Sequence, residues 1–286
     1  MKKATLYVTL EPCCHHGKTP PCTDLILEMG IPRVVIGTPD PHEKVGGQGI
    51  SRLREAGCEV LVGILQDRCR EHHRRFITFH EKRRPYIIRK WAQSADGFMA
   101  PPRNLRAKTP RPFWISGKAA RQLVHQWRSE EQGILVGTRT ALEDNPRLNT
   151  RLWSGSSPLR ILIDRELKVP RNYHIYNTEA NTLIFCNVAY QPETTANLRF
   201  HGLTGQKPLL LEVLEGLWKE QVQSVLVEGG ARTLNGFLEK GIWDEARILE
   251  GPNTMGNGLE APQVEGTLVD HWKLEKDQIS IVRNDT

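Results

Sequence analysis

The chain has 286 residues, of which 38% are hydrophobic and 25% charged, and a formal net charge of +6. This balance is typical of a folded globular protein, and the length is sufficient for two domains. No apolar run of about 18 residues occurs, so we expect no membrane span. The N-terminal stretch MKKATLYVTLEP has no small-residue cleavage site, and we do not interpret it as a signal peptide.

The first eighty residues alternate between short apolar strands and helical patterns. Strands are predicted at 4–10, 33–37 and 58–63, and helices from about 22, at 48–56 and at 65–80. Alternation of this kind favours a three-layer α/β domain. The charged stretch HEKRRP then predicts a boundary near residue 83, so we expect domains at 1–83 and 84–286.

A second series of elements follows this boundary. A strand, YIIRKWAQS, begins after Pro85 and leads to a loop rich in proline and arginine at 101–113. The helix at 117–132 places Ala120, Leu123 and Trp127 on one face. The strands GILVG, LRILID and NTLIFC follow, and then come a helix at 209–221, the strand SVLVEGG, a helix at 232–240 and the strand EARILE. The second domain is therefore predicted to be α/β as well.

The cysteines and the basic residues are both clustered. Three of the six cysteines lie at 13, 14 and 22, and the absence of a secretion signal favours a reducing cytoplasm, where such a cluster indicates a metal site or catalysis. The basic stretches between 68 and 85 could contact nucleic acid. Few aromatic residues lie among these charges, so we favour a solvated helix face.

The stretch PCCHHGKTPPC at 12–22 is typical of half a zinc site. Zinc prefers thiolate and imidazole ligands. Zinc-dependent nucleobase deaminases take one ligand from an H-x-E segment, whose Glu transfers protons, and two from cysteines that follow a proline. The alternative is a cysteine-rich turn that holds no metal.

The segments TLEPCCHHGKTPPC and PDPHEKVGGQGISRLREAG resemble the deaminase domain of the RibD family of bifunctional riboflavin-biosynthesis enzymes. The resemblance implies part of a cytidine-deaminase-like three-layer α/β/α domain, with Cys13 and Cys22 as Zn²⁺ ligands. None of the ten histidines has Glu two positions later, so the third ligand and the catalytic Glu are missing. We therefore expect an N-terminally truncated domain, an incomplete zinc site and little deamination.

From Arg84 onward the sequence resembles the reductase domain of the same family, which has a dihydrofolate-reductase-like α/β fold and uses NADPH. The resemblance is carried by RPYIIRKWAQSADGFMA, HQWRSEEQGILVGTRTALEDNPRLNTR and SVLVEGGARTLNGFLEKGIWDE. Lys90 would be a cation in a mostly buried strand, which requires a partner. Gly229 and Gly230 would let the backbone approach a phosphate at a helix N-terminus. No G-x-G-x-x-G motif follows a strand, so a Rossmann domain is not indicated.

The resemblance also implies the roles of individual residues. The expected catalytic residues are Asp144, Lys90 and Glu228, and the expected substrate-binding residues are Arg128, Leu148, Arg151 and Glu228. Arginine suits a phosphate because its guanidinium binds two oxygens at once. The expected NADPH-binding residues are Ala92, Trp114, Thr140, Asp144, Arg165, Gly230, Ala231, Arg232, Thr233, Leu234, Asn235 and Gly236.

The expected function is reduction of 5-amino-6-(5-phosphoribosylamino)uracil by NADPH, with hydride delivered to C1 of the ribosyl group. The partner would be this phosphoribosyl pyrimidine, without nucleic acid or membrane, and the chain would form a homo-oligomer in the cytoplasm. One alternative is a bifunctional enzyme that also deaminates the pyrimidine. The other is a non-enzymatic nucleic-acid-binding protein, which salt-sensitive binding without NADPH binding would favour.

Overall fold

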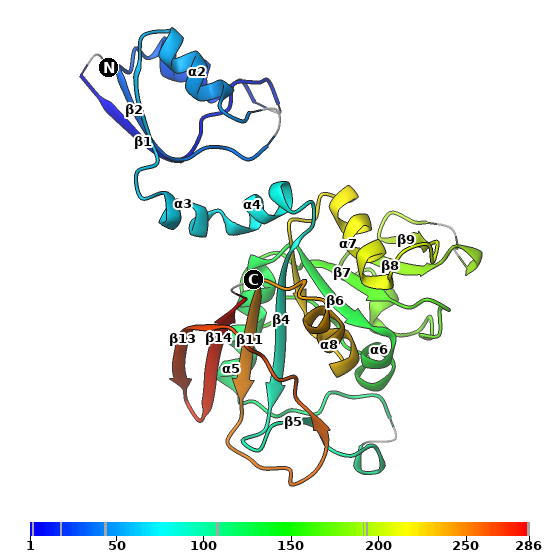
Figure 1. The fold of residues 1–286 in the computed structure, drawn as a ribbon. Helices are drawn as coiled ribbons and strands as arrows, with labels where there is room; N and C mark the ends of the chain where they lie inside the picture. Colours follow the sequence, from blue (N-terminus) through cyan, green and yellow to red (C-terminus); the bar gives the residue numbers. More distant parts are fainter. Residues whose placement is uncertain are drawn as a thin grey trace. The chain divides into compact units, whose positions relative to one another are not determined.

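The computed structural model describes residues 1, 3–17, 19–42, 45–106, 109–190, 192 and 194–284. The chain divides into two compact units, Met1–Arg84 and Pro85–Thr286. Each is an α/β fold with its own sheet and core (Figure 1). Within the described residues, no helix has both the length and the apolar character needed to span a bilayer.

The first unit contains a parallel sheet with the strand order β1-β2-β3. Its elements are β1 Thr5–Leu10, α1 Cys22–Glu28, β2 Arg33–Thr38, α2 Gln48–Glu55, β3 Glu59–Val62, α3 Gln66–His72 and α4 Arg74–Glu81. The core contains Val34, Ile36 and Leu53, all fully buried. The prediction of a single helix at 65–80 is wrong, because the structure has two helices there, α3 and α4. The chain leaves helical geometry at His73, whose ring Nε2 lies 2.8 Å from the Thr9 hydroxyl of β1.

Glu11 connects the end of β1 to the start of α2. Its carboxylate is buried and accepts hydrogen bonds from the backbone N–H groups of Asp40 at 3.1 Å, Gly47 at 3.0 Å and Ile50 at 3.1 Å. A carboxylate at a helix N-terminus satisfies N–H groups that have no partner inside the helix. Glu11 therefore fixes the chain immediately before Pro12 and Cys13 against α2.

The second unit contains a nine-stranded sheet with the order β13-β14-β11-β4-β10-β6-β7-β8-β9. Strands β11 to β9 in this order are parallel, and β14 and β13 add an antiparallel hairpin at one edge. The strands are β4 Tyr86–Gln93, β5 Phe98–Ala100, β6 Gly133–Gly137, β7 Leu159–Ile163, β8 Thr182–Asn187, β9 Leu198–Leu203, β10 Ser224–Val227, β11 Glu245–Glu250, β12 Leu259–Glu260, β13 Thr267–Leu274 and β14 Asp277–Arg283. Strands β5 and β12 pair separately.

Helices cover both faces of this sheet (Figure 1). They are α5 Lys118–Glu130, α6 Thr138–Asp144, α7 Leu209–Lys219 and α8 Ala231–Glu239, with short 3₁₀ turns η1 Arg103–Leu105, η2 His174–Tyr176 and η3 Val188–Tyr190. Residues of α7 and α8 pack against one face, and residues of α5 and α6 against the other. The face of α5 predicted from its spacing is confirmed, because Ala120 and Trp127 are buried.

Arg89 of β4 is fully buried within the core on the α7 and α8 side. Its guanidinium lies 5.3 Å from the ring centres of both Trp91 and Trp243. In the part of the chain that the structure describes, none of its three nitrogens has a hydrogen-bond partner. Burial lowers the pKa of Arg89 to about 10. Each of the two cation–π contacts stabilises the Arg89 charge by about 0.5–2 kcal/mol, whereas burying an ion costs several kcal/mol. The Arg89 charge therefore destabilises the fold.

We expect Arg89→Met to raise the melting temperature by about 2–6 °C, because it removes a buried charge and keeps an unbranched side chain. The matched control is Arg160→Met. Arg160 is equally buried, but its guanidinium donates to the carbonyl oxygens of His174, Asn177 and Ala180 at 2.5–2.8 Å. This variant should lower the melting temperature, because it leaves those acceptors unpaired. Thermal melts that moved in the same direction for both variants would contradict this account.

Candidate functional site

Three charged side chains meet at the carboxyl ends of two central strands in the second unit. Lys90 lies on β4, Glu228 directly follows β10, and Arg128 lies in the last turn of α5. Arg128 donates from Nε to Glu228 Oε1 at 2.7 Å and from Nη2 to Oε2 at 2.8 Å. Lys90 Nζ lies 3.6 Å from Glu228 Oε2. The structure thus brings together three residues that the sequence suggested separately.

This cluster is buried and carries a net positive charge. The side chains are 14%, 11% and 7% exposed for Lys90, Arg128 and Glu228. Burial alone would raise the pKa of Glu228, but the charges of Arg128 and Lys90 outweigh it and lower that pKa to about 2. The pKa of Lys90 is lowered by burial, and the Glu228 charge opposes this shift. Glu228 is therefore the group that keeps both cations compatible with burial.

His125 belongs to the same site, and sequence reasoning missed it. It lies on α5, one turn before Arg128, and is almost completely buried. Its Nδ1 has no hydrogen-bond partner among the described residues. Burial, together with the charges of Arg128 and Arg151, lowers the pKa of His125 to about 4, so the ring is neutral at pH 7. The spacing of three from Arg128 was the available signal, because residues three apart share a helix face.

Arg147 and Arg151 lie on the loop that follows α6. Arg151 is exposed and donates to the side-chain oxygen of Asn149 at 3.1 Å. Arg147 lies 3.8 Å from Glu179, which also accepts a hydrogen bond from Asn149 at 2.9 Å. The charges of Arg128 and Glu228 act on the pKa of Arg151, so this loop lies within electrostatic reach of the buried cluster. These arginines form an accessible cationic edge beside it.

The same loop has an unusual backbone. Asn145 and Leu148 have positive φ angles of 41° and 52°. Asparagine tolerates this conformation, but leucine rarely adopts it. The predicted substrate-binding residue Leu148 is buried in the hydrophobic cluster that includes Ala141 of α6. Burial of the Leu148 side chain holds the strained loop in place.

Asp144 is the last residue of α6 and is partly buried. Burial raises its pKa to about 6, the neighbouring Glu143 carboxylate adds to the shift, and Arg106 opposes it. Thr140 precedes Asp144 by four residues and therefore shares its helix face. The side chain of Thr140 packs against Gly229 and Gly230, which directly follow Glu228. Asp144 thus lies one helical turn, about 5 Å along α6, from Thr140, which contacts the glycine turn beside the charged cluster.

The glycine turn has the features of a site for a phosphate-containing cofactor. A Cβ atom at Gly229 would lie 2.8 Å from Thr140 Cγ2, and Gly230 has a φ of 37°. Gly230 precedes α8, and no side chain caps that helix. The Asn235 side-chain oxygen on α8 is buried and has no hydrogen-bond partner within the described residues. The free N–H groups at the uncapped start of α8 suit a phosphate group, and the Asn235 oxygen is available to accept a hydrogen bond from a donor elsewhere on such a cofactor.

The remaining predicted cofactor residues lie at separate places. Ala92 is partly buried near the end of β4, and Arg165 is exposed two residues after the end of β7. Trp114 is exposed in the segment before α5, with the guanidinium of Arg121 4.7 Å from its ring centre. Thr233 contacts the start of α6, because a Cβ atom at Gly137 would lie 2.8 Å from its hydroxyl. Ala231, Arg232, Leu234 and Gly236 lie on α8 with Asn235.

In the first unit, the thiols of Cys13 and Cys22 are adjacent. The backbone N–H of Cys22 donates to Cys13 Sγ at 3.3 Å, and a hydrogen bond between the two thiols raises the pKa of Cys22. Among the described residues, however, no group of three or more His, Cys, Asp and Glu side chains could hold a metal ion. Two sulfur ligands are fewer than the three protein ligands of a catalytic zinc site. The residues present therefore do not complete a zinc site.

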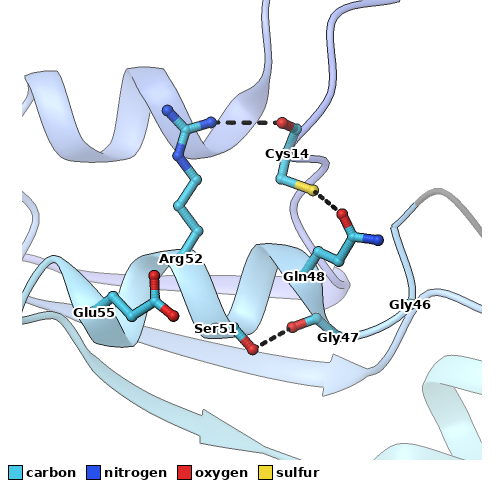
Figure 2. Close-up of a pocket in the computed structure, with 7 residues that line it drawn as sticks. All are labelled: Cys14, Gly46, Gly47, Gln48, Ser51, Arg52 and Glu55. Atoms are coloured by element: carbon cyan, nitrogen blue, oxygen red, sulfur yellow. Dashed lines mark hydrogen bonds between the residues drawn. The ribbon is translucent and has the colours of Figure 1, made fainter.

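Cys14 lines a pocket of about 520 Å³ against α2 (Figure 2). Its thiol lies 3.9 Å from the side-chain oxygen of Gln48, and Arg52 donates to its carbonyl oxygen at 3.5 Å. Arg52 also forms an ion pair with Asp24 of α1 at 2.6 Å. Cys14 therefore contributes to the packing of the cysteine loop on α2.

Comparison with known proteins gives matches to both units. The family described as RibD C-terminal domain matches residues 85–286, and the family described as cytidine and deoxycytidylate deaminase zinc-binding region matches residues 1–38. The chain is 40% identical over 266 residues to the riboflavin biosynthesis protein RibD of Aquifex aeolicus. The aligned region covers 90% of this chain and 72% of that protein.

Two solved structures are similar over almost the whole chain. One is the diaminohydroxyphosphoribosylaminopyrimidine deaminase/5-amino-6-(5-phosphoribosylamino)uracil reductase of Thermotoga maritima, with a TM-score of 0.84 and 32% identity over 98% of this chain and 79% of that chain. The other is RibD of Acinetobacter baumannii, with a TM-score of 0.85 and 29% identity over 99% of this chain and 81% of that chain.

Proposed function

The chain belongs to the RibD family of riboflavin-biosynthesis proteins, as a reductase with a deaminase region that is present only in part, and on this premise we propose a specific reaction for Pro85–Thr286. It reduces 5-amino-6-(5-phosphoribosylamino)uracil to the ribityl product with NADPH. The observation that carries the proposal is the buried cluster of Lys90, Glu228 and Arg128 beside the glycine turn.

The charged groups would have different roles in substrate binding. Arg128 uses Nε and Nη2 for Glu228 and donates from Nη1 to the carbonyl oxygen of Asn149 at 3.1 Å. It therefore positions Glu228, which orients the polar ribosyl group together with Lys90. The exposed Arg151 is better placed to bind the substrate phosphate, because its guanidinium can form two parallel hydrogen bonds to phosphate oxygens.

NADPH would be held by the glycine turn, by the start of α8 and by Asn235, and it would supply the hydride. The chain must then supply a proton as the sugar ring opens. With a pKa of about 6, Asp144 still holds a proton in a fraction of molecules near neutral pH, and it can exchange that proton readily. We assign this role to Asp144. The cationic Lys90 would stabilise negative charge that develops on the ribosyl oxygen.

Oxidation of NADPH by the purified chain tests this proposal. We expect oxidation that depends on the phosphoribosylamino-uracil substrate and yields one ribityl product per NADPH consumed, as measured by absorbance and mass spectrometry. The substrate without its phosphate is the informative control, because loss of the Arg151 contact should mainly raise KM. Absence of turnover with the complete substrate would contradict the proposal.

For the deaminase region, we expect no release of ammonia from the aminopyrimidine substrate by this chain after it has been loaded with zinc. The sequence has no H-x-E segment, and a positioned acid–base group contributes about 10²–10⁴-fold to the rate. Zinc content after dialysis measures whether the metal is retained, and an ammonia assay measures deamination. Stoichiometric zinc together with steady ammonia release would support the bifunctional alternative instead.

A further inference from the structure

The segment Pro101–Arg106, which follows β5 and contains η1, is attached to the end of α6 through one carboxylate. Arg106 Nη1 lies 2.5 Å from Glu143 Oε2, and Arg103 Nη2 lies 3.2 Å from Glu143 Oε1. Arg106 also donates from Nε to the carbonyl oxygen of Pro101 at 2.9 Å, which closes the segment on itself. Further along, the backbone N–H of Arg111 donates to the Glu143 carbonyl oxygen at 3.1 Å.

The two arginines are not equivalent. The side chains of Arg106 and Glu143 are 22% and 27% exposed, whereas that of Arg103 is 71% exposed. A short ion pair that is mostly shielded from water is stronger than an exposed one, which contributes only about 0–1 kcal/mol. Arg106 is therefore the arginine that holds the segment on α6. Arg103 pairs with the same carboxylate but is exposed to water, so it serves as the matched control.

Glu143 directly precedes Asp144, the residue to which we assign proton transfer. Among the charged groups that the structure describes, Glu143 on α6 and Arg106 on the Pro101–Arg106 segment are the two that act on the Asp144 carboxyl. Their effects are opposite, because a neighbouring carboxylate disfavours ionisation of Asp144 and a neighbouring guanidinium favours it. The electrostatic environment of Asp144 thus depends on whether Arg106 is paired with Glu143.

We propose that Arg106 is a positioning residue of the reductase site, which holds Pro101–Arg106 on α6 through Glu143 and offsets the Glu143 charge beside the Asp144 carboxyl. The significance for catalysis rests on the proposed function of Asp144, whereas the ionic arrangement is independent of it.

Four variants test the inference: Arg106→Gln, Glu143→Gln, the double variant Arg106→Gln/Glu143→Gln, and the rim control Arg103→Gln. The probe is the carboxyl ¹³C resonance of Asp144 in protein with labelled aspartate, assigned by its loss in Asp144→Asn. We expect Arg106→Gln to raise the midpoint of this titration by about half a pH unit or more, and Glu143→Gln to lower it similarly. The double variant should return towards the original value, and Arg103→Gln should shift it by less than half as much as Arg106→Gln.

The pH profile of kcat for NADPH oxidation provides the second readout, and its inflection should move in the same direction as the resonance in each variant. Arg106→Lys, which keeps the charge, should restore most of the original profile. Equal titration midpoints in all variants, or shifts of the same sign in Arg106→Gln and Glu143→Gln, would contradict the inference. If the resonance shifts as expected but the kcat profile does not, the inference stands and the proposed role of Asp144 is contradicted.

Discussion

Glu228→Gln should lower kcat/KM for NADPH-dependent reduction by about 100-fold or more, because it removes the only carboxylate that the described residues place between Lys90 and Arg128. Breaking a buried ion pair on one side costs about 3–5 kcal/mol, since the remaining charge stays buried without compensation. Without Glu228, burial and the Arg128 charge both lower the pKa of Lys90. A neutral Lys90 could not stabilise the developing negative charge on the substrate.

The same substitution should lower stability in a way that depends on pH. The pKa of Glu228 is lowered from 4.5 to about 2 in the folded chain. The native state therefore releases this proton more readily than the unfolded chain does, and the pair stabilises the fold fully above about pH 4.5. That contribution is lost as the pH falls towards 2. Thermal melts at pH 7 and pH 3 should thus show a larger effect of Glu228→Gln at pH 7.

Glu166→Gln is the matched control for Glu228→Gln. Glu166 also pairs with a lysine, Lys168, at 2.7 Å, but both side chains are more than half exposed. Because exposed ion pairs contribute little, we expect kcat/KM within about twofold of the original and an unchanged melting temperature. Steady-state kinetics well below both melting temperatures separate catalysis from folding. If Glu228→Gln behaved like Glu166→Gln, the cluster would have no role in the reaction.

The sequence predicted the α/β framework, because buried parallel strands are short apolar runs bounded by turns. It missed β9 and the hairpin of β13 and β14. β9 and β13 are the edge strands, and β13 is mostly exposed, so their sequences lack a continuous apolar run. β14 lies between β13 and β11, and polar residues interrupt its sequence, DQISIVR. Edge strands are governed by pairing rather than by burial, and pairing partners cannot be identified from one sequence alone.

The candidate site was predicted as individual residues rather than as an arrangement. Arg128 and Glu228 are 100 residues apart, and only the fold shows that the first is bonded to the second. The same holds for Arg106 and Glu143, whose segment had no recognisable motif. Glu11 was quoted in the cysteine motif without a role, and the structure shows that it caps α2. Long-range polar contacts of this kind depend on how the elements pack together, and the spacing of apolar residues in the sequence does not indicate that packing.

Asp144→Asn should lower kcat by about 10²–10³-fold, because the amide cannot transfer a proton. It should also stabilise the chain at pH 8. The folded chain has a pKa of about 6 at Asp144, above the usual 3.8, so it holds the proton more tightly than the unfolded chain does. The carboxyl therefore contributes its full stability below about pH 3.8, and that contribution is lost as the pH rises through about 6.

Above that range the wild-type chain must keep a partly buried carboxylate charged, which costs about 1–3 kcal/mol, whereas Asn carries no charge. We expect Asp144→Asn to raise the melting temperature by about 3–8 °C at pH 8 and by much less at pH 4.5. A substitution that raises the melting temperature and lowers kcat indicates a residue that serves function and destabilises the fold. If the variant were less stable at both pH values, Asp144 would be a structural residue, and the proton-transfer role would have to pass to another group.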